Sequence, residues 1–235
     1  MYNEIVILSI TAASLGFIHT ILGVDHYIPF IAVSKSLNWS RSKTLLITAI
    51  SGVGHVLSTV LIGLIGIAIG LSLTSFESIE NVRGEIAGWL LLSFGFAYTI
   101  FGLIKSKKKH SHSHFHLTSG EFHHHEHTHD DIEHKHIHKT PSKLTGWLLF
   151  LILVFGPCES LIPILMIPAA QHSTSGLIVV TLIFGLATVL TMLVMVYLGI
   201  LGVNLIKVKK AERHIHTLAG LSILICGIGV QFLGL

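Results

Sequence analysis

Residues 5–33 read IVILSITAASLGFIHTILGVDHYIPFIAV. This run is longer than the ~20 apolar residues that a helix needs to cross the hydrocarbon core of a bilayer. Near its middle it carries an acid and two histidines, Asp25 with His19 and His26, beside Gly23 and Pro29. Glycine and proline weaken a helix, so we predict a membrane-spanning segment that is broken or kinked close to these polar residues.

The remainder of the chain repeats this apolar pattern. It is 51% apolar and only 11% charged, whereas about a quarter of the residues in a soluble domain are charged. We therefore predict an all-α membrane protein with six transmembrane helices. The expected spans are Ile5–Val33, Thr44–Leu73, Gly84–Ile104, Gly146–Ala170, Leu177–Ile206 and Leu218–Leu235.

The basic residues predict how these spans are oriented. Fourteen of the 15 Lys and Arg residues fall in the loops after spans one, three and five, and only Arg83 falls on the opposite side. By the positive-inside rule those three loops are cytoplasmic, so both termini of a multi-pass cell-membrane protein would face outward. The start of the chain lacks the basic region of a cleaved signal, so we expect an uncleaved first span.

Small residues recur in the same order in both halves. Span three has Ala87-Gly88, Gly95 and Gly102-Leu103, and span six has Ala219-Gly220, Gly227 and Gly234-Leu235. Gly52–Ser58 also corresponds to Gly185–Thr191, and Gly23–His26 to Gly156–Glu159. Because each half has three spans, the halves would be inverted repeats with a site near the midplane, as in secondary transporters. We expect repeats at 1–104 and 146–235, joined by a loop at 105–145.

The polar residues of spans one and two form the first candidate site. Ionisable groups inside a membrane persist mainly where they have a partner or a task. His19 and His26 would lie about 10 Å apart on a straight helix, too far to share one ion, so local unwinding is needed for them to converge with Asp25. His55 on the second span is a fourth candidate metal ligand. The alternative is that Asp25 and His26 form a structural hydrogen-bonded pair.

The fourth span contains the second candidate site, Gly156-Pro157-Cys158-Glu159. Proline removes a backbone donor and leaves carbonyl groups that need a partner. Cys158 and Glu159 would then be able to ligate or relay a cation. A kinked helix with a packed Cys158 and a protonated, hydrogen-bonded Glu159 explains the same residues. Imidazole, carboxylate and thiolate ligands suit nickel, cobalt or zinc better than magnesium or calcium.

The loop between the third and fourth spans is rich in histidine. Residues 110–138 hold 12 of the 18 histidines in the chain. We expect this loop to be disordered and to capture or buffer metal ions at the cytoplasmic mouth. The residues concerned are His110, His112, His114, His116, His123, His124, His125, His127, His129, His134, His136 and His138.

Together these residues give the chain a family resemblance. His19-x5-Asp25-His26, Gly54-His55 and Gly156-Pro157-Cys158 resemble the motifs of NicO-type nickel/cobalt permeases and their UreH-like branch, in the superfamily of LysE-like transporters. The better-known permeases have one residue fewer between the first histidine and the acid. The resemblance implies a nickel or cobalt carrier with His19, Asp25, His26 and His55 as metal residues.

We therefore expect a permease for divalent nickel or cobalt, with zinc as a further candidate and export slightly favoured over import. No enzymatic activity, required cofactor or nucleic-acid partner is expected, and the chain has no P-loop for ATP hydrolysis.

One alternative is a membrane-embedded metal-dependent enzyme that uses Asp25, His26 and Glu159. The other is a thiol-redox conduit, since the LysE-like superfamily includes disulfide-electron carriers with a Pro-Cys element. Such a conduit needs two cysteines that can pair, and only Cys158 and Cys226 are present.

Overall fold

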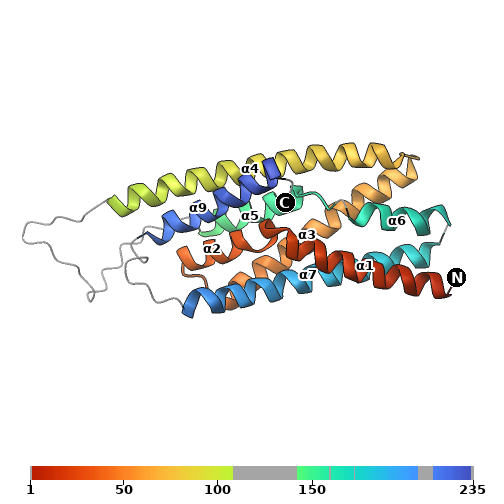
Figure 1. The fold of residues 1–235 in the computed structure, drawn as a ribbon, viewed down its shortest axis with the longest axis horizontal. Coiled ribbons are helices and arrows are strands. Elements are labelled where there is room, and N and C mark those ends of the chain that lie inside the picture. Colours follow the sequence, from red (N-terminus) through yellow and green to blue (C-terminus); the bar gives the residue numbers. More distant parts are fainter. Residues whose placement is uncertain (1, 108–141, 159, 172, 206–213, 234–235) are drawn as a thin grey trace, which may run out of the picture.

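The computed structural model describes residues 2–107, 142–158, 160–171, 173–205 and 214–233. Over these ranges the chain is helical and contains no strand. The elements form one elongated bundle (Figure 1). They are α1 (Tyr2–Leu22), the 3-10 turn η1 (Val24–His26), α2 (Ile28–Ser36), α3 (Arg41–Ala68), α4 (Leu73–Lys107), α5 (Ser142–Phe155), α6 (Leu161–Ala170), α7 (Thr174–Leu205), α9 (Ile215–Ile228) and the π-helical turn η2 (Gly229–Leu233).

Five helical segments in the described ranges are long and apolar enough to cross a membrane: Glu4–Leu22, Arg41–Ala68, Leu73–Ser106, Thr174–Asn204 and Ile215–Leu233. Their mean hydropathy lies between 1.7 and 2.7. The fourth expected span is instead divided into two short apolar helices, α5 and α6. The prediction of an all-helical, multi-pass membrane protein is therefore confirmed.

Both segments that we predicted to be broken are broken. The first span is interrupted between α1 and α2, where Gly23 and η1 replace regular helix. Pro29 lies in the first turn of α2, where proline is tolerated because the N–H that it lacks would have no helical partner. The fourth span is interrupted between Phe155 and Leu161, around Pro157. The two interruptions place non-helical backbone inside the bundle rather than at its ends (Figure 1).

Glycines allow α9 to pack closely against the C-terminal half of α4 (Figure 1). A β-carbon on Gly95 would overlap the backbone of Leu224, and one on Gly102 would overlap the backbone of Thr217. From the other side, a β-carbon on Gly227 would overlap the backbone at Leu92. The recurring small residues in these two spans therefore form one helix–helix interface, as small residues do in membrane proteins.

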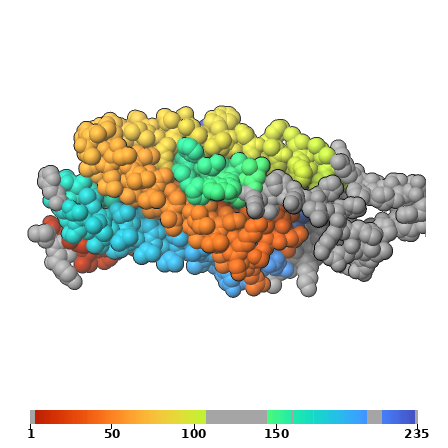
Figure 2. Space-filling view, turned by 180° about the vertical axis from the view of Figure 1, so that it is seen from behind, coloured from red at the N-terminus to blue at the C-terminus, as the bar shows by residue number. Residues whose placement is uncertain are grey.

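The bundle as a whole has two buried apolar clusters. One joins α2, α4, α5, α7 and α9 around Phe30, Leu91 and Met192, and the other joins α1, α3, α6 and α7 around Leu161 and Phe184. Short α5 lies on the surface between α3 and α4 in the rear view (Figure 2). Its outer side chains are apolar, including Trp147 at 63% exposure. Exposed apolar surface of this kind is what a lipid-facing helix requires.

We expect Gly95→Ala to lower the stability of the folded bundle by about 1–3 kcal/mol, because the added methyl group must displace the backbone of α9. Thermal unfolding of the purified protein in detergent measures the effect. Gly202→Ala is the matched control, since no described atom lies within 4 Å of the added β-carbon. Equal melting temperatures for the two variants would contradict this packing.

Candidate functional site

The first helix break depends on a glycine. Gly23 has φ −74° and ψ 86°, outside the helical range, and its N–H still donates to His19 O at 2.9 Å. A β-carbon here would lie only 2.5 Å from His26 Nδ1, so a larger residue would push the His26 ring away. The 3-10 turn that follows directs His26 back toward α1. This local unwinding is the arrangement that we predicted from Gly23 and Pro29.

Three buried or half-buried histidines meet at this break. The ring centroids of His19 and His26 lie 4.9 Å apart, as do those of His26 and His55. One ring nitrogen from each residue can be chosen so that all three lie within 4.8 Å of one another. His26 and His55 are almost fully buried, at 3% and 0% exposure. Histidines from two helices are thus brought within the range of a single ion.

Hydrogen bonds determine which nitrogen of each ring carries a lone pair. His55 Nδ1 lies 2.9 Å from the carbonyl oxygen of Leu153, and a carbonyl can only accept, so Nδ1 carries the proton. His26 Nδ1 lies 2.9 Å from Asp25 Oδ1 and 3.1 Å from Gly23 O, which are also acceptors. In the neutral rings both Nε2 atoms therefore present lone pairs, and they face each other at 3.4 Å. A proton or a cation is needed to make this contact favourable.

The remaining histidine and the acid complete the cluster. His19 Nε2 is buried without a hydrogen-bond partner among the described residues. Asp25, whose expected role as a metal ligand stays a prediction, places its Oδ1 2.9 Å from Nδ1 of His26. A carboxylate in this position orients the ring and makes the opposite nitrogen more basic. The structure therefore places the four residues together, with Asp25 acting through His26.

The second helix break is held by a buried ion pair that the sequence interpretation missed. Arg83 Nη1 donates to Glu80 Oε1 and Nη2 donates to the carbonyls of Val154 and Gly156, at 2.9 and 3.2 Å. Glu80 Oε2 accepts the backbone N–H of Cys158 at 2.9 Å. Proline and the break leave these backbone groups without helical hydrogen-bond partners. Arg83 and Glu80 take the place of those partners.

We had considered Arg83 only as a lone basic residue outside the membrane. A signal was present, since an acid and a base three residues apart face the same side of a helix and can pair. Arg83 also donates to Ser58 and Thr59 on α3, so it fastens α4 to both α3 and the second break. Its side chain is 9% exposed and that of Glu80 is fully buried.

A cavity of about 680 Å³ lies between the two breaks. It reaches His19, Asp25 and His26 on one side, and Pro157 and Ser160 on the other. Polar side chains from α4 and η2 also line it, namely Asn81, Glu85 and Gln231, together with apolar side chains that include Leu15, Ile18, Leu22 and Val230. The histidine cluster and the second helix break therefore open on the same cavity.

The two cysteines are thiols and do not form a disulfide with each other. Cys158 is fully buried in the cluster around Leu161 and Phe184, and Cys226 is 3% exposed in the other apolar cluster. Glu159 and the histidine-rich loop at 110–138 lie outside the described residues, so their predicted metal-binding roles stay predictions.

The fold and the site define a polytopic helical membrane protein with two broken helices and, between them, a cavity that ionisable side chains help to line. A family model described as the cytochrome C biogenesis protein transmembrane region matches residues 28–229. The chain belongs to this family, since the match covers most of its length. Neither the curated proteins nor the solved structures gave a significant match.

This family assignment corrects two expectations. The predicted membership of the NicO and UreH-like permeases is wrong, because the family model places the chain in a different family. The predicted function, transport of nickel or cobalt, is wrong for the same reason. The motifs that suggested it are three short stretches of common membrane residues, whereas the family model matches about two hundred consecutive positions. The alternative that agrees with the family is the thiol-redox conduit.

Arg83→Gln should destabilise the protein by about 3–5 kcal/mol, because Glu80 then remains as a buried charge without its partner. Denaturant unfolding in detergent measures the loss. The double variant Glu80→Gln/Arg83→Gln removes both charges and should recover part of the stability. If the double variant is no more stable than Arg83→Gln, the charge pairing is not what holds the break.

Proposed function

We propose that this protein passes reducing equivalents across the membrane by thiol–disulfide exchange at Cys158. The observation that carries the proposal is the position of Cys158 directly after Pro157 in the second helix break, within a chain that belongs to the cytochrome c biogenesis family. Pro157 and Ser160, on either side of this segment, line the cavity between the two breaks. A small movement of the break would expose the Cys158 sulfur to a partner thiol or disulfide.

The exchange needs two thiols, and Cys226 supplies the second. The Cys158 thiolate attacks a disulfide of an extracytoplasmic protein, forming a mixed disulfide and releasing one thiol of that protein. The Cys226 thiolate then attacks the Cys158 sulfur, which releases the second thiol and leaves a Cys158–Cys226 disulfide. Two electrons and two protons pass to the partner. A dithiol protein on the cytoplasmic side restores both cysteines by the reverse exchange and becomes oxidised itself.

The two cysteines lie in separate apolar clusters, so this cycle requires the helices to move. We propose that the six expected spans form two inverted three-helix repeats that rock against each other. Reciprocal packing supports this arrangement: Gly95 of α4 faces Leu224 of α9, and Gly227 of α9 faces Leu92 of α4. Similarly, α1 packs on α7 while α3 packs on α5. The basic loops would be cytoplasmic and both termini extracytoplasmic.

Cys158→Ser should abolish transfer of electrons, because no sulfur remains at the break to attack the incoming disulfide. The assay uses proteoliposomes containing a reduced dithiol protein inside and a disulfide-bonded acceptor protein outside, with the acceptor's thiols measured over time. Cys226→Ser, the matched control, should stop turnover but accumulate a mixed disulfide between Cys158 and the acceptor, visible by non-reducing electrophoresis. Wild-type transfer rates in Cys158→Ser would rule out the proposed function.

The histidine cluster supports a second proposal, that the same cavity holds a resident transition-metal ion. His26 and His55 direct bare Nε2 atoms at a common point, and His19 Nε2 has no described partner there. Three imidazoles leave one position of a tetrahedral ion open, which the adjoining cavity can supply with water. The ion is proposed as a bound component of the site and not as a transported substrate.

Metal binding is measured with cobalt(II), whose visible absorption reports tetrahedral coordination by nitrogen. All proteins in the comparison carry alanine at the 12 loop histidines, because those imidazoles would bind cobalt independently. His26→Ala should lose the tetrahedral spectrum, and Asp25→Asn should weaken binding by about 10–100-fold. His216→Ala is the control, since this residue contacts Tyr98 and Lys105 instead. Unchanged binding in His26→Ala would remove the metal site.

A further inference from the structure

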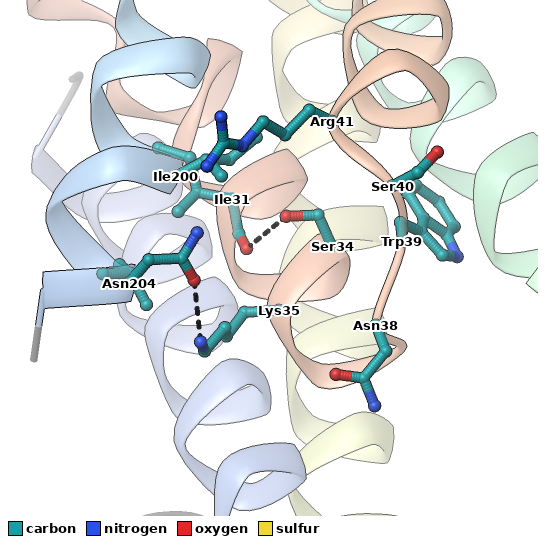
Figure 3. A pocket seen from close by; sticks show the side chains of 10 residues that line it. Ile31, Ser34, Lys35, Asn38, Trp39, Ser40, Arg41, Ile200 and Asn204 are labelled. Atoms are coloured by element: carbon teal, nitrogen blue, oxygen red, sulfur yellow. Dashed lines mark hydrogen bonds between the residues drawn. The ribbon is translucent and has the colours of Figure 1, made fainter. Parts of the chain in front are cut away.

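A separate cavity of about 300 Å³ lies at the end of the bundle where α2 turns into α3, against the end of α7 (Figure 3). Its floor is apolar, formed by side chains that include Ile31 and Ile200. Its rim is polar and carries two basic residues, Lys35 and Arg41. Neither the redox proposal nor the histidine cluster uses this cavity.

The charges of this cavity are unbalanced. Lys35 Nζ donates to Asn204 Oδ1 at 2.8 Å (Figure 3), which is a neutral partner, so the positive charge is oriented but not compensated. Arg41 reaches in from the first turn of α3 on the other side. No carboxylate from the described part of the chain lines the cavity. Lys35, which Asn204 orients, and the exposed Arg41 lie among amide and hydroxyl groups, and together they form a site for an anion with several acceptor oxygens.

A shallow apolar groove lies farther along α3 and α7. It has a volume of about 460 Å³ and is lined by Leu45 and Ala49 of α3 together with side chains of α7. Arg41, Leu45 and Ala49 are spaced four residues apart, so they follow one face of α3. On α7, Tyr197 and Leu193 continue the face of Ile200 in the same direction. The groove therefore follows the cationic cavity at a distance of about one helical turn along α3 and α7.

We propose that this seam between α3 and α7 binds one anionic phospholipid. The phosphate lies between Lys35 and Arg41, and an acyl chain follows the groove past Ala49. A basic pocket at the membrane surface is suited to an anionic headgroup, and an apolar groove farther along the same helices is suited to the attached hydrocarbon. Trp39, which lines the cavity and lies under the Lys43 ammonium at 4.6 Å from the ring centroid, occupies the interfacial position common for tryptophan.

Native mass spectrometry of the full chain in detergent tests this proposal with phosphatidylglycerol and phosphatidylcholine of identical acyl chains. The wild-type protein should retain phosphatidylglycerol in preference. Lys35→Gln and Arg41→Gln should each weaken its binding about fivefold, the effect expected for one basic charge near a membrane phosphate. Lys105→Gln is the matched control: it removes a basic charge from the described chain without touching the cavity, and it should bind like wild type.

Two further measurements distinguish the lipid from a small anion. Ala49→Phe fills the groove below the cationic cavity and should weaken phosphatidylglycerol binding while leaving Lys35 and Arg41 in place. Inorganic phosphate added at the same concentration should not displace the lipid. Displacement by phosphate, or unchanged binding in Ala49→Phe, would overturn the lipid assignment. Equal losses in Lys105→Gln and Arg41→Gln would overturn the site. Cys158→Ser should retain the lipid, so this result is independent of the redox proposal.

Discussion

The structure depends on satisfying backbone hydrogen bonds where two helices are interrupted inside an apolar bundle. Hydrocarbon offers no partner to a bare carbonyl or N–H group, and each unsatisfied group costs several kcal/mol. At the second break Arg83 donates to the carbonyls of Val154 and Gly156. His55 Nδ1 donates a second hydrogen bond to Leu153 O, which also accepts the N–H of Gly156. Glu80 serves the N–H of Cys158. Side chains from α3 and α4 thus make irregular backbone possible at this depth.

The same interactions connect the two halves of the site. His55 closes the end of α5 with one nitrogen and meets His26 with the other. The geometry of the second break therefore affects the histidine cluster at the first. A movement that exposes Cys158 would also alter the His55–Leu153 contact, because Leu153 lies in the last turn of α5, immediately before the break. We infer that the thiol and the histidines respond together to motion of α5 and α6.

Much of this arrangement could be predicted from the sequence, because it follows from strong local signals. Long apolar runs define the spans, and Gly23 and Pro157 indicate where helices cannot continue. The convergence of His19 and His26 followed from the same reasoning, since ionisable groups in hydrocarbon need a partner. The function was not predictable in this way. The motifs that suggested a metal permease are short, and short motifs of glycine, histidine and acid occur on related membrane folds with different activities.

The roles of Asp25, Glu80 and Arg83 could not be read from residue type alone. An aspartate beside a histidine can ligate an ion or hold the histidine ring. The direction of the 3-10 turn, which the sequence does not show, places the Asp25 carboxylate against the His26 ring.

Arg83 falls near the end of an expected loop, where a charge normally faces water, yet a long α4 carries it into the bundle. Its burial depends on the uncapped carbonyls of a segment 71 and 73 residues away along the chain. The spacing of Glu80 and Arg83 indicates that the two residues can pair, but their burial has no local signature, because the backbone groups that they bind belong to a distant segment of the chain.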